Sequence, residues 1–172
     1  MIGTSASGKS TLSKQLAEKL NLDHIELDDL FWQDNWQETP DAEFFQKIQH
    51  KIDLAANGYV IDGNYTRTIP VKWQDIDTVI WLDLPFHLNV LQAIKRALHR
   101  AVFQTNLWKS SNNTESFRKL LSRDSIVLWM INTHHKNKKI YQEMMHHPDF
   151  SHIQFIHLRS RQQIQQFLEQ VH

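Results

Sequence analysis

The sequence predicts an α/β fold, in which a parallel β-sheet carries helices on both faces. Three observations lead to this prediction. Residues 3–10 read G-x-x-x-x-G-K-S, a pattern that cradles phosphate groups at the start of a helix. Short apolar runs then alternate with helix-length segments, as in sheets built from strand–helix–strand units. Three of these runs end in an aspartate, at the strand ends where such sheets hold their functional residues.

The loop at residues 3–10 gives each of its fixed residues a role. Two glycines let the backbone curl, so that successive N–H groups point at phosphate oxygens. Lys9 carries a positive charge to the terminal phosphates, and the Ser10 hydroxyl is a ligand for Mg²⁺. Leucines recur every four residues after the loop, which predicts a helix whose amino end adds to the anion site. The phosphates of ATP are therefore expected to contact Gly3, Ser5, Ala6, Ser7, Gly8, Lys9, Ser10 and Thr11.

The loop lies unusually close to the start of the sequence. Only Met1 and Ile2 precede Gly3, whereas a phosphate loop normally follows a buried strand and strands usually run about 5–6 residues. Either a few residues are missing before Met1 or the central strand is reduced to a stub, and we favour the first alternative. Both alternatives predict a truncated first strand.

Composition limits the class of protein. A length of 172 residues suits one domain, and 19 basic against 19 acidic residues give a net charge of zero, which argues against a dedicated nucleic-acid binder. The absence of cysteine excludes disulfides and thiolate metal sites. No apolar run approaches the roughly 18 residues of a membrane span, and no basic-then-apolar leader is evident. We therefore expect a cytoplasmic protein of one domain, residues 1–172, either monomeric or dimeric, with no membrane contact.

Apolar spacing and turn residues place the remaining elements. The strands are expected at residues 24–27, 59–61, 78–82 and 153–158. The helices are expected at residues 11–20, 40–55, 86–103, 115–147 with a break near Arg123, and 161–171. Residues 104–116 are polar and turn-prone, which predicts an exposed connection between the two longest helices.

Taken together, these features resemble a known superfamily. The phosphate loop, the Asp-Gly pair at 62–63, the segment at 79–85 and an arginine-bearing helix after it resemble the adenylate kinase-like and shikimate kinase-like P-loop kinases. A narrower resemblance, to the bacterial DNA topology modulation proteins, rests on HIELDDLFW at 24–32, IDGNYTR at 61–67 and LRSR at 158–161. The resemblance covers nearly the whole chain. It implies a three-layer P-loop fold with a five-stranded parallel sheet in the order 2-3-1-4-5 and a helical lid at about residues 104–125.

The resemblance also implies a donor site for Mg²⁺-ATP. Asp62 is expected to help hold the Mg²⁺ together with Ser10, because the resemblance places the metal's acidic residue on the third strand. Asp83 is the alternative, since it too is an aspartate at the end of an apolar run. A simple turn role at a strand end stays open for either aspartate.

The acceptor is expected to face Asp28, which would take or orient a hydroxyl proton, because an acid at this place serves substrate and metal in shikimate kinase-like members. Capping of the short segment at 30–32 is the alternative, and we assign that cap to Asp29. Arg67 is expected to clamp an anionic group of the acceptor, or else to be a solvated loop arginine. Further side chains expected at the acceptor, with core packing as the equal alternative for the aromatic ones, are Phe31, Trp32, Trp36, Asn64, Tyr65 and Trp73.

Arginines are scarce and gather around the expected lid. Four of the seven in the chain are Arg96, Arg100, Arg118 and Arg123. By resemblance, Arg96 keeps the position that contacts ATP phosphates, and Arg123 would stabilise the transferred charge from the lid. Solvated helix surfaces are the alternative for each. Further contacts to ATP are expected from Arg100 and, over the adenine, from Arg159 and Ser160.

Two departures from the family pattern reduce the positive charge near the transferred phosphoryl group. Gln92 stands where the family usually has an arginine, and residues 132–139 carry histidine, asparagine and lysine in place of arginines. The adjacent histidines at 134–135 and 146–147 diverge by about 100° on a helix and cannot chelate one metal, so we expect them to be solvated. The lysines at 136, 138 and 139 are likewise expected on a solvated helix face.

The sequence therefore predicts a Mg²⁺-ATP-dependent kinase that phosphorylates a hydroxyl or phosphate of a small molecule, whose identity the residues do not reveal. Closure of the lid would exclude water and suppress hydrolysis. The alternative is a nucleotide-binding regulatory protein with weak ATPase activity, of the DNA topology modulation type. The charge balance favours the kinase, whereas the arginine-poor lid favours the regulator.

Overall fold

The computed structural model describes residues 1–103, 107–108, 110–114 and 126–171. Most of the expected lid, together with Arg118 and Arg123, lies outside the described residues. Strands and helices alternate along the chain as the sequence predicts, and every strand pairing is parallel. None of the helices in the described ranges is both long and apolar enough to cross a membrane.

The element bounds agree closely with the expected ones where the structure describes them, whereas residues 115–125 of the expected helix at 115–147 lie outside the described residues. The strands are β1 (Ile2–Gly3), β2 (Asp23–Glu26), β3 (Tyr59–Asp62), β4 (Thr78–Leu82) and β5 (Gln154–Leu158). The α-helices are α1 (Lys9–Leu20), α2 (Leu27–Phe31), α3 (Asp41–Leu54), α4 (Ile69–Lys72), α5 (Phe86–Phe103), α7 (Ile126–Met145) and α8 (Arg161–Gln170). Short 3₁₀ turns are η1 (Asp34–Trp36), η2 (Thr66–Thr68) and η3 (Pro148–Phe150). The short helix α4 was not expected from the sequence, and α2 lies earlier than the short capped segment expected at 30–32.

The strands form two parallel sheets, where the sequence led us to expect one sheet of five strands. One sheet has the order β1-β4-β5 and the other pairs β2 with β3. The division falls beside β1, which is two residues long and is paired only with β4, through Ile2 to Trp81 and Gly3 to Leu82. A two-residue strand offers too few backbone groups to form a ladder on both of its edges.

A side-chain amide joins the two sheets. Asn64, just after β3, accepts a hydrogen bond from the Gly3 N–H at 3.2 Å and donates one to the Gly3 carbonyl at 2.6 Å. The Met1 amino group also donates to the carbonyl of Ile61. Asn64 thereby occupies the place of a neighbouring strand at Gly3, and it fixes the start of the phosphate loop against the end of β3.

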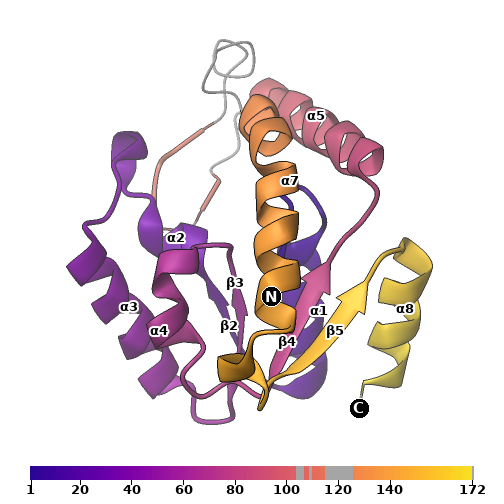
Figure 1. The fold of residues 1–172 in the computed structure, drawn as a ribbon. Helices are drawn as coiled ribbons and strands as arrows, with labels where there is room; N and C mark the ends of the chain where they lie inside the picture. Colours follow the sequence, from indigo (N-terminus) through magenta and orange to yellow (C-terminus); the bar gives the residue numbers. More distant parts are fainter. Residues whose placement is uncertain (104–106, 109, 115–125, 172) are drawn as a thin grey trace.

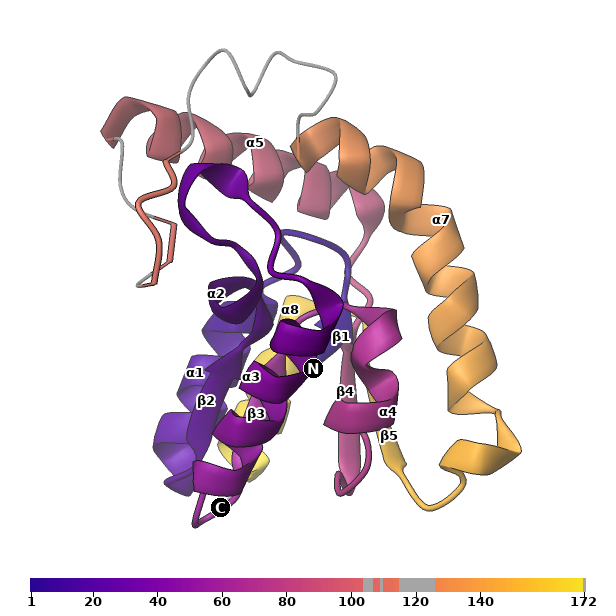
Figure 2. The ribbon, with the colours of Figure 1, turned by 90° about the vertical axis from the view of Figure 1, so that its left-hand side faces the viewer.

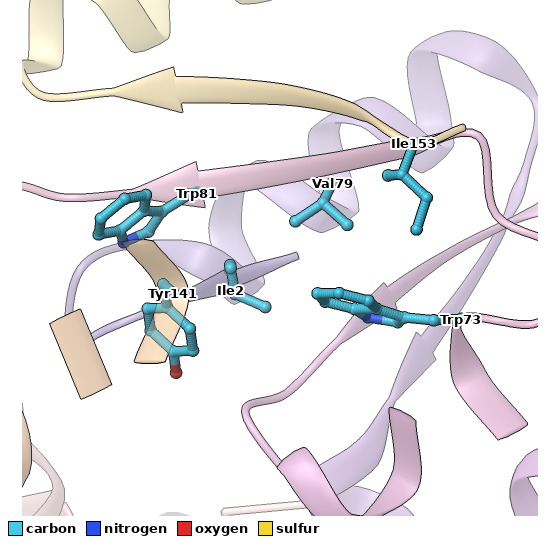
Figure 3. Close-up of a cluster of buried hydrophobic side chains, with 6 residues drawn as sticks. All are labelled: Ile2, Trp73, Val79, Trp81, Tyr141 and Ile153. Atoms are coloured by element: carbon cyan, nitrogen blue, oxygen red, sulfur yellow. The ribbon is translucent and has the colours of Figure 1, made fainter. Parts of the chain in front are cut away.

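Helices cover both faces of the sheets (Figure 1, Figure 2). On one face, α1 and α8 pack against the ends of β4 and β5 through a cluster around Leu12, Leu16, Leu82 and Leu158. On the other face, α7 packs on β4. The cluster there comprises Ile2, Trp73, Val79, Trp81, Tyr141 and Ile153, whose side chains converge in Figure 3.

This second cluster decides between the two alternatives for Trp73. The side chain is 7% exposed and packs with Ile2 and Val79, so Trp73 follows the alternative of core packing. The indole lies there because α4 turns the chain inward between β3 and β4. The aromatic residues around Phe31 form a third cluster, in which α2 and α3 cover β2 and β3.

Candidate active site

The phosphate loop curls between β1 and α1 through unusual backbone angles. Gly3 has φ 146°, and a Cβ there would lie 2.5 Å from the carbonyl oxygen of Leu82. Gly8 has φ 95° and stands at the N-cap of α1 without any side chain to cap it. The first N–H groups of α1 therefore keep no side-chain acceptor, which leaves the helix amino end open to an anion.

Lys9 is the first residue of α1, and its side chain folds back over the loop. Its ammonium group donates to the carbonyls of Gly3 and Thr4, each at 3.0 Å. Burial lowers the pKa of Lys9, while the carboxylates of Asp62 and Asp28 oppose that shift. A partly buried cation held mainly by neutral carbonyls gains most from an anion placed beside it.

Asp62 ends β3 and is almost completely buried, with 3% exposed. Its Oδ1 has no hydrogen-bond partner among the described residues. A buried carboxylate oxygen without a partner is costly, and it is the kind of oxygen that Mg²⁺ prefers as a ligand. The structure thus provides an acidic oxygen suited to a cation at the position that the sequence assigned to the metal.

A second buried lysine lies next to Asp62. Lys72, at the end of α4, is 3% exposed and donates to the carbonyl of Gly63 at 3.0 Å. Burial lowers its pKa to about 7, with Asp62 opposing the shift. Sequence reasoning missed Lys72. The available signal was a lysine placed directly between Val71 and Trp73, in an otherwise apolar segment.

Asp28 lies in α2 and shares this electrostatic environment. The Tyr65 hydroxyl donates to its Oδ1 at 2.6 Å. Burial raises the pKa of Asp28; the Tyr65 hydrogen bond lowers it, as do the charges of Lys9 and Arg96, whereas Asp62 raises it. A carboxylate with a raised pKa is a stronger base, which suits a group that accepts a proton.

Asp29 does not cap a helix, so that expectation is wrong. The helix α2 begins at Leu27, three residues earlier than expected, and its N-cap is Glu26. Asp29 therefore lies inside the first turn, and its carboxylate accepts hydrogen bonds at 3.0 Å from both the backbone N–H and the hydroxyl of Ser110. This pair fastens the described part of the expected lid to α2.

The described residues 107–108 and 110–114 form several further contacts with the segment after α2. The Asn113 amide accepts from the Trp36 N–H at 2.9 Å and donates to the Gln33 carbonyl at 2.8 Å. Trp108 stacks on Trp32, with ring centroids 6.2 Å apart. Two of the expected acceptor-side aromatics, Trp32 and Trp36, are therefore covered by this segment in the structure, whereas Phe31 is buried in the core.

Arg96 reaches the phosphate loop from α5. Its guanidinium lies 3.5 Å from the Ser5 hydroxyl. Arg100 follows one turn later on α5, and Gln92 precedes by one turn. The Gln92 Nε2 is buried with no hydrogen-bond partner among the described residues. The face of α5 that carries Arg96 is thus turned toward the loop, as the sequence predicted for that arginine.

Arg67 takes a position on the acceptor side, although it already has a partner. Its Nε donates to Asp41 at 2.8 Å, in a pair with both side chains well exposed. The guanidinium also lies 5.0 Å from the centroid of Phe31 and 5.6 Å from that of Tyr65. Stacking on these rings holds Arg67 beside the residue that hydrogen-bonds Asp28, and its role as a clamp stays a prediction.

Asp83 is engaged by two partners. Its carboxylate accepts from Lys138 at 2.9 Å and from His157 at 3.1 Å. The His157 ring is stacked on Trp81, and Arg159 lies against its other nitrogen at 3.4 Å. Ser160 caps α8 by accepting from the Gln163 N–H. These contacts favour Asp62 over Asp83 as the acidic residue for a metal.

His134 differs from what the sequence predicted. It is 7% exposed, its Nδ1 lies 3.2 Å from the Thr4 hydroxyl, and its ring packs against Phe86. The expectation that His134 is solvated is therefore wrong, because α7 turns this face inward over the phosphate loop. The adjacent His135 is exposed, with its ring centroid 5.2 Å from that of His134.

Comparisons with known proteins point to nucleotide kinases. No protein-family model matches the chain. It is 30% identical over 113 residues to the adenylate kinase of Methanothrix thermoacetophila, which covers 49% of this chain and 52% of that protein. It is also 30% identical over 133 residues to the adenylate kinases of two strains of Mesomycoplasma hyopneumoniae, covering 64% of this chain and 61% of each relative. The chain thus spans between about half and three fifths of these relatives, a likeness that supports a P-loop kinase-like relationship.

Proposed function

We propose that this protein is a Mg²⁺-ATP-dependent phosphotransferase that acts on a small molecule or nucleotide. One observation carries the proposal: Lys9, Asp28, Asp62 and Arg96 come from four different elements and meet around one phosphate-binding loop. Two cations and two carboxylates at such a loop are the groups that phosphoryl transfer requires. The similarity to adenylate kinases supports the same class of reaction.

The donor half of the site consists of the loop and the charges next to it. The first N–H groups of α1 would receive the phosphates, while Lys9 and Arg96 would place positive charge beside them. Ser10 and the buried Asp62 would hold Mg²⁺, which supplies further positive charge to the phosphate oxygens when bound. Because Lys9 is partly buried and desolvation lowers its pKa, the entry of a polyanion would relieve the cost of its charge.

The acceptor half of the site centres on Asp28. Its carboxylate would take the proton of the attacking hydroxyl, or orient that hydroxyl toward the phosphate. Tyr65 fixes the carboxylate by its 2.6 Å hydrogen bond. Arg67 is held beside Tyr65 and would bind an anionic group of the acceptor in exchange for Asp41. Trp32 would wall the acceptor site, and Asn64 would keep the loop in register with β3.

The proposal includes three finer points. First, the two sheets are halves of one P-loop arrangement in the order 2-3-1-4-5, supported by the Asn64–Gly3 hydrogen bonds across the division. Second, residues 104–125 act as the lid of a single domain, carrying Arg123 toward the transferred phosphoryl group, while Arg100, Arg159 and Ser160 contact ATP. Third, the HIELDDLFW and IDGNYTR segments relate the chain to the DNA topology modulation group, as a cytoplasmic protein.

The test is ADP release from Mg²⁺-ATP across nucleosides, nucleotides, shikimate-like acids and sugars. We expect at least one acceptor to stimulate release, and Lys9→Ala to abolish that stimulation. Lys14→Ala, an exposed lysine on the same helix, is the matched control and should behave as the unaltered protein. Equal turnover by Lys9→Ala, or no stimulation by any acceptor, would contradict the proposal.

One observation favours a second candidate, a nucleotide-binding regulator with weak ATPase activity. Gln92 stands in the helix that faces the loop, where the family usually has an arginine, and its buried Nε2 brings no charge. Duplex DNA distinguishes the two candidates. Micromolar binding that weakens steeply with salt, with no acceptor-dependent turnover, would establish the regulator in place of the kinase.

A further inference from the structure

Thr4 lies within the phosphate loop, and its hydroxyl meets a histidine from a distant helix. The Thr4 Oγ1 lies 3.2 Å from the Nδ1 of His134 in α7, and both residues are buried, with 9% and 7% exposed. The Thr4 carbonyl accepts hydrogen bonds from the Lys9 ammonium group at 3.0 Å and from the Ser7 N–H at 3.2 Å. Thr4 therefore links the ring of His134 to the groups that shape the loop.

The face of α7 that carries His134 is anchored to the sheet. Lys138, one turn after His134, donates to the carboxylate of Asp83 at 2.9 Å. Tyr141, about one turn further, packs edge-on against Trp81, with ring centroids 5.8 Å apart. Positions 134, 138 and 141 share one face of a helix, so these contacts hold the imidazole beside the loop.

The groups around His134 decide when the ring carries a proton. The charged and titratable groups that reach this histidine or the loop beside it are His135 and Lys138 of α7, Asp83 after β4, Arg96 of α5 and Lys9 of α1. Burial lowers the pKa of His134; the charges of His135 and Lys138 lower it further, whereas Asp83 raises it. The ring is therefore neutral at pH 7 in the free protein. A polyanion in the loop favours the charged form and raises this pKa.

The protonation state of His134 also controls where the Thr4 hydroxyl donates its proton. A hydroxyl has one proton to donate, and in a neutral imidazole one nitrogen is an acceptor. A neutral ring with its proton on Nε2 accepts from the Thr4 hydroxyl at Nδ1. In the imidazolium both nitrogens donate, so Nδ1 donates to the Thr4 oxygen and the hydroxyl proton turns to another acceptor. A phosphate oxygen held by the loop is such an acceptor.

We propose that His134 is a positioning residue that takes up a proton when the loop binds a polyphosphate, and that the imidazolium then turns the Thr4 hydroxyl toward that anion. Nucleotide binding therefore becomes stronger as the pH falls through the range in which His134 titrates. The charge of His134 adds to those of Lys9 and Arg96. It compensates in part for Gln92, whose buried amide brings no charge. This inference rests on the proposed ATP site and adds a regulation by pH to it.

The first test measures the affinity for Mg²⁺-ADP by calorimetry between about pH 8 and pH 6, on both sides of the ordinary histidine pKa. His134→Gln removes the titrating ring, and His135→Gln, at the exposed neighbour, is the matched control. From pH 8 to pH 6, we expect the affinity of the unaltered protein and of His135→Gln to rise about three- to tenfold more than that of His134→Gln. The ionisation of ADP contributes equally to all three proteins. The same pH dependence in His134→Gln as in the unaltered protein would overturn the inference.

The NMR signals of the His134 ring, identified by their loss in His134→Gln, provide the second test. We expect the pKa read from these signals to rise when Mg²⁺-ADP binds, and to rise less in Thr4→Val, which lacks the hydroxyl. An equal rise in Thr4→Val would overturn the role of Thr4. If ADP binds and the pKa of His134 stays unchanged, the inference is wrong and the proposed function stands. If the unaltered protein binds no ADP at any pH, both are wrong.

Discussion

The ends of β3 and β4 carry the same sequence signal and acquire opposite roles. Asp62 and Asp83 each follow an apolar run, yet Asp62 Oδ1 has no hydrogen-bond partner among the described residues, whereas Asp83 is bound by Lys138 and His157. Asp62 is buried next to the phosphate loop, and Asp83 ties α7 to the sheet. An unpartnered carboxylate is available to a ligand, and a paired one supports structure.

The largest expected effect comes from neutralising each aspartate in turn. Asp62→Asn should lower acceptor-dependent ADP release by about 10²–10³-fold, because it removes the carboxylate charge that is proposed to hold Mg²⁺ at the phosphates. Asp83→Asn should change the rate by less than about tenfold. Initial rates at saturating ATP measure both. Comparable losses in the two variants would erase the distinction between the two strand ends.

Lys72, which lies next to Asp62, should make the free energy of unfolding depend on pH. Its folded pKa of about 7 lies below the value of 10.5 for a free lysine, so the unfolded chain binds more protons between these values and stability should rise with pH. Lys72→Met should raise the unfolding free energy at pH 7 by a few kcal/mol and reduce the slope by up to about 1.4 kcal/mol per pH unit between pH 8 and 9.5. Urea unfolding at several pH values measures both quantities.

The exposed Lys14→Met is the control for that measurement and should leave the slope unchanged. If Lys72→Met and the unaltered protein show the same slope of unfolding free energy against pH, burial does not lower the pKa of Lys72 as the structure indicates. The comparison uses differences between variants, so other titrating groups contribute equally to both curves.

The contacts of Asp83 with Lys138 and His157 should affect the free energy of unfolding more than the rate of ADP release. Asp83→Asn should cost about 1–2 kcal/mol, since it weakens two hydrogen bonds to a partly buried carboxylate. Lys138→Met alone should cost a similar amount, and the double variant should cost less than the sum of the two. Thermal unfolding in a double-mutant cycle measures the coupling. Strict additivity would show that the pair contributes nothing.

The smallest expected effect concerns Asp28, the third aspartate that follows a strand. Burial raises its pKa and the Tyr65 hydrogen bond opposes that rise. Tyr65→Phe should therefore raise the pKa further and lower activity about three- to tenfold at neutral pH. Activity needs the deprotonated carboxylate, so the acid limb of kcat/KM should move to higher pH. If the acid limb of kcat/KM keeps its position while kcat falls, Tyr65 acts by packing and does not tune the pKa of Asp28.

Local patterns predicted most of the framework. The loop at 3–10, the strand at 78–82 and the helix at 86–103 fall where expected, because glycine geometry, apolar runs and helical periodicity are properties of neighbouring residues. The assignment of Arg96 to the loop side also agrees with its contact to Ser5. Bounds were less accurate where a strand passes directly into a short helix, as at Leu27.

The errors share a physical cause. Asp29 and His134 were misjudged because their surroundings come from segments far away in the sequence, Ser110 and Thr4. For Trp73, contacts with the distant Ile2 and Val79 decided between the two alternatives that the sequence left open. Lys72 was missed for the same reason, since only packing between the sheets shows that its charge is buried. For none of these side chains do the residues nearby in the sequence indicate which distant segment packs against it.

The sequence by itself determined a glycine-bearing loop at the start of a helix, an alternating α/β framework and aspartates at strand ends, since each follows from the chemistry and spacing of adjacent residues. Only the tertiary structure decided which aspartate keeps a buried oxygen without a hydrogen-bond partner among the described residues, and which histidine and lysine are buried. The burial and hydrogen bonding of a side chain depend on contacts with distant segments. Those contacts set the free energy needed to keep the side chain charged, and so decide whether it supports the structure or is open to a ligand.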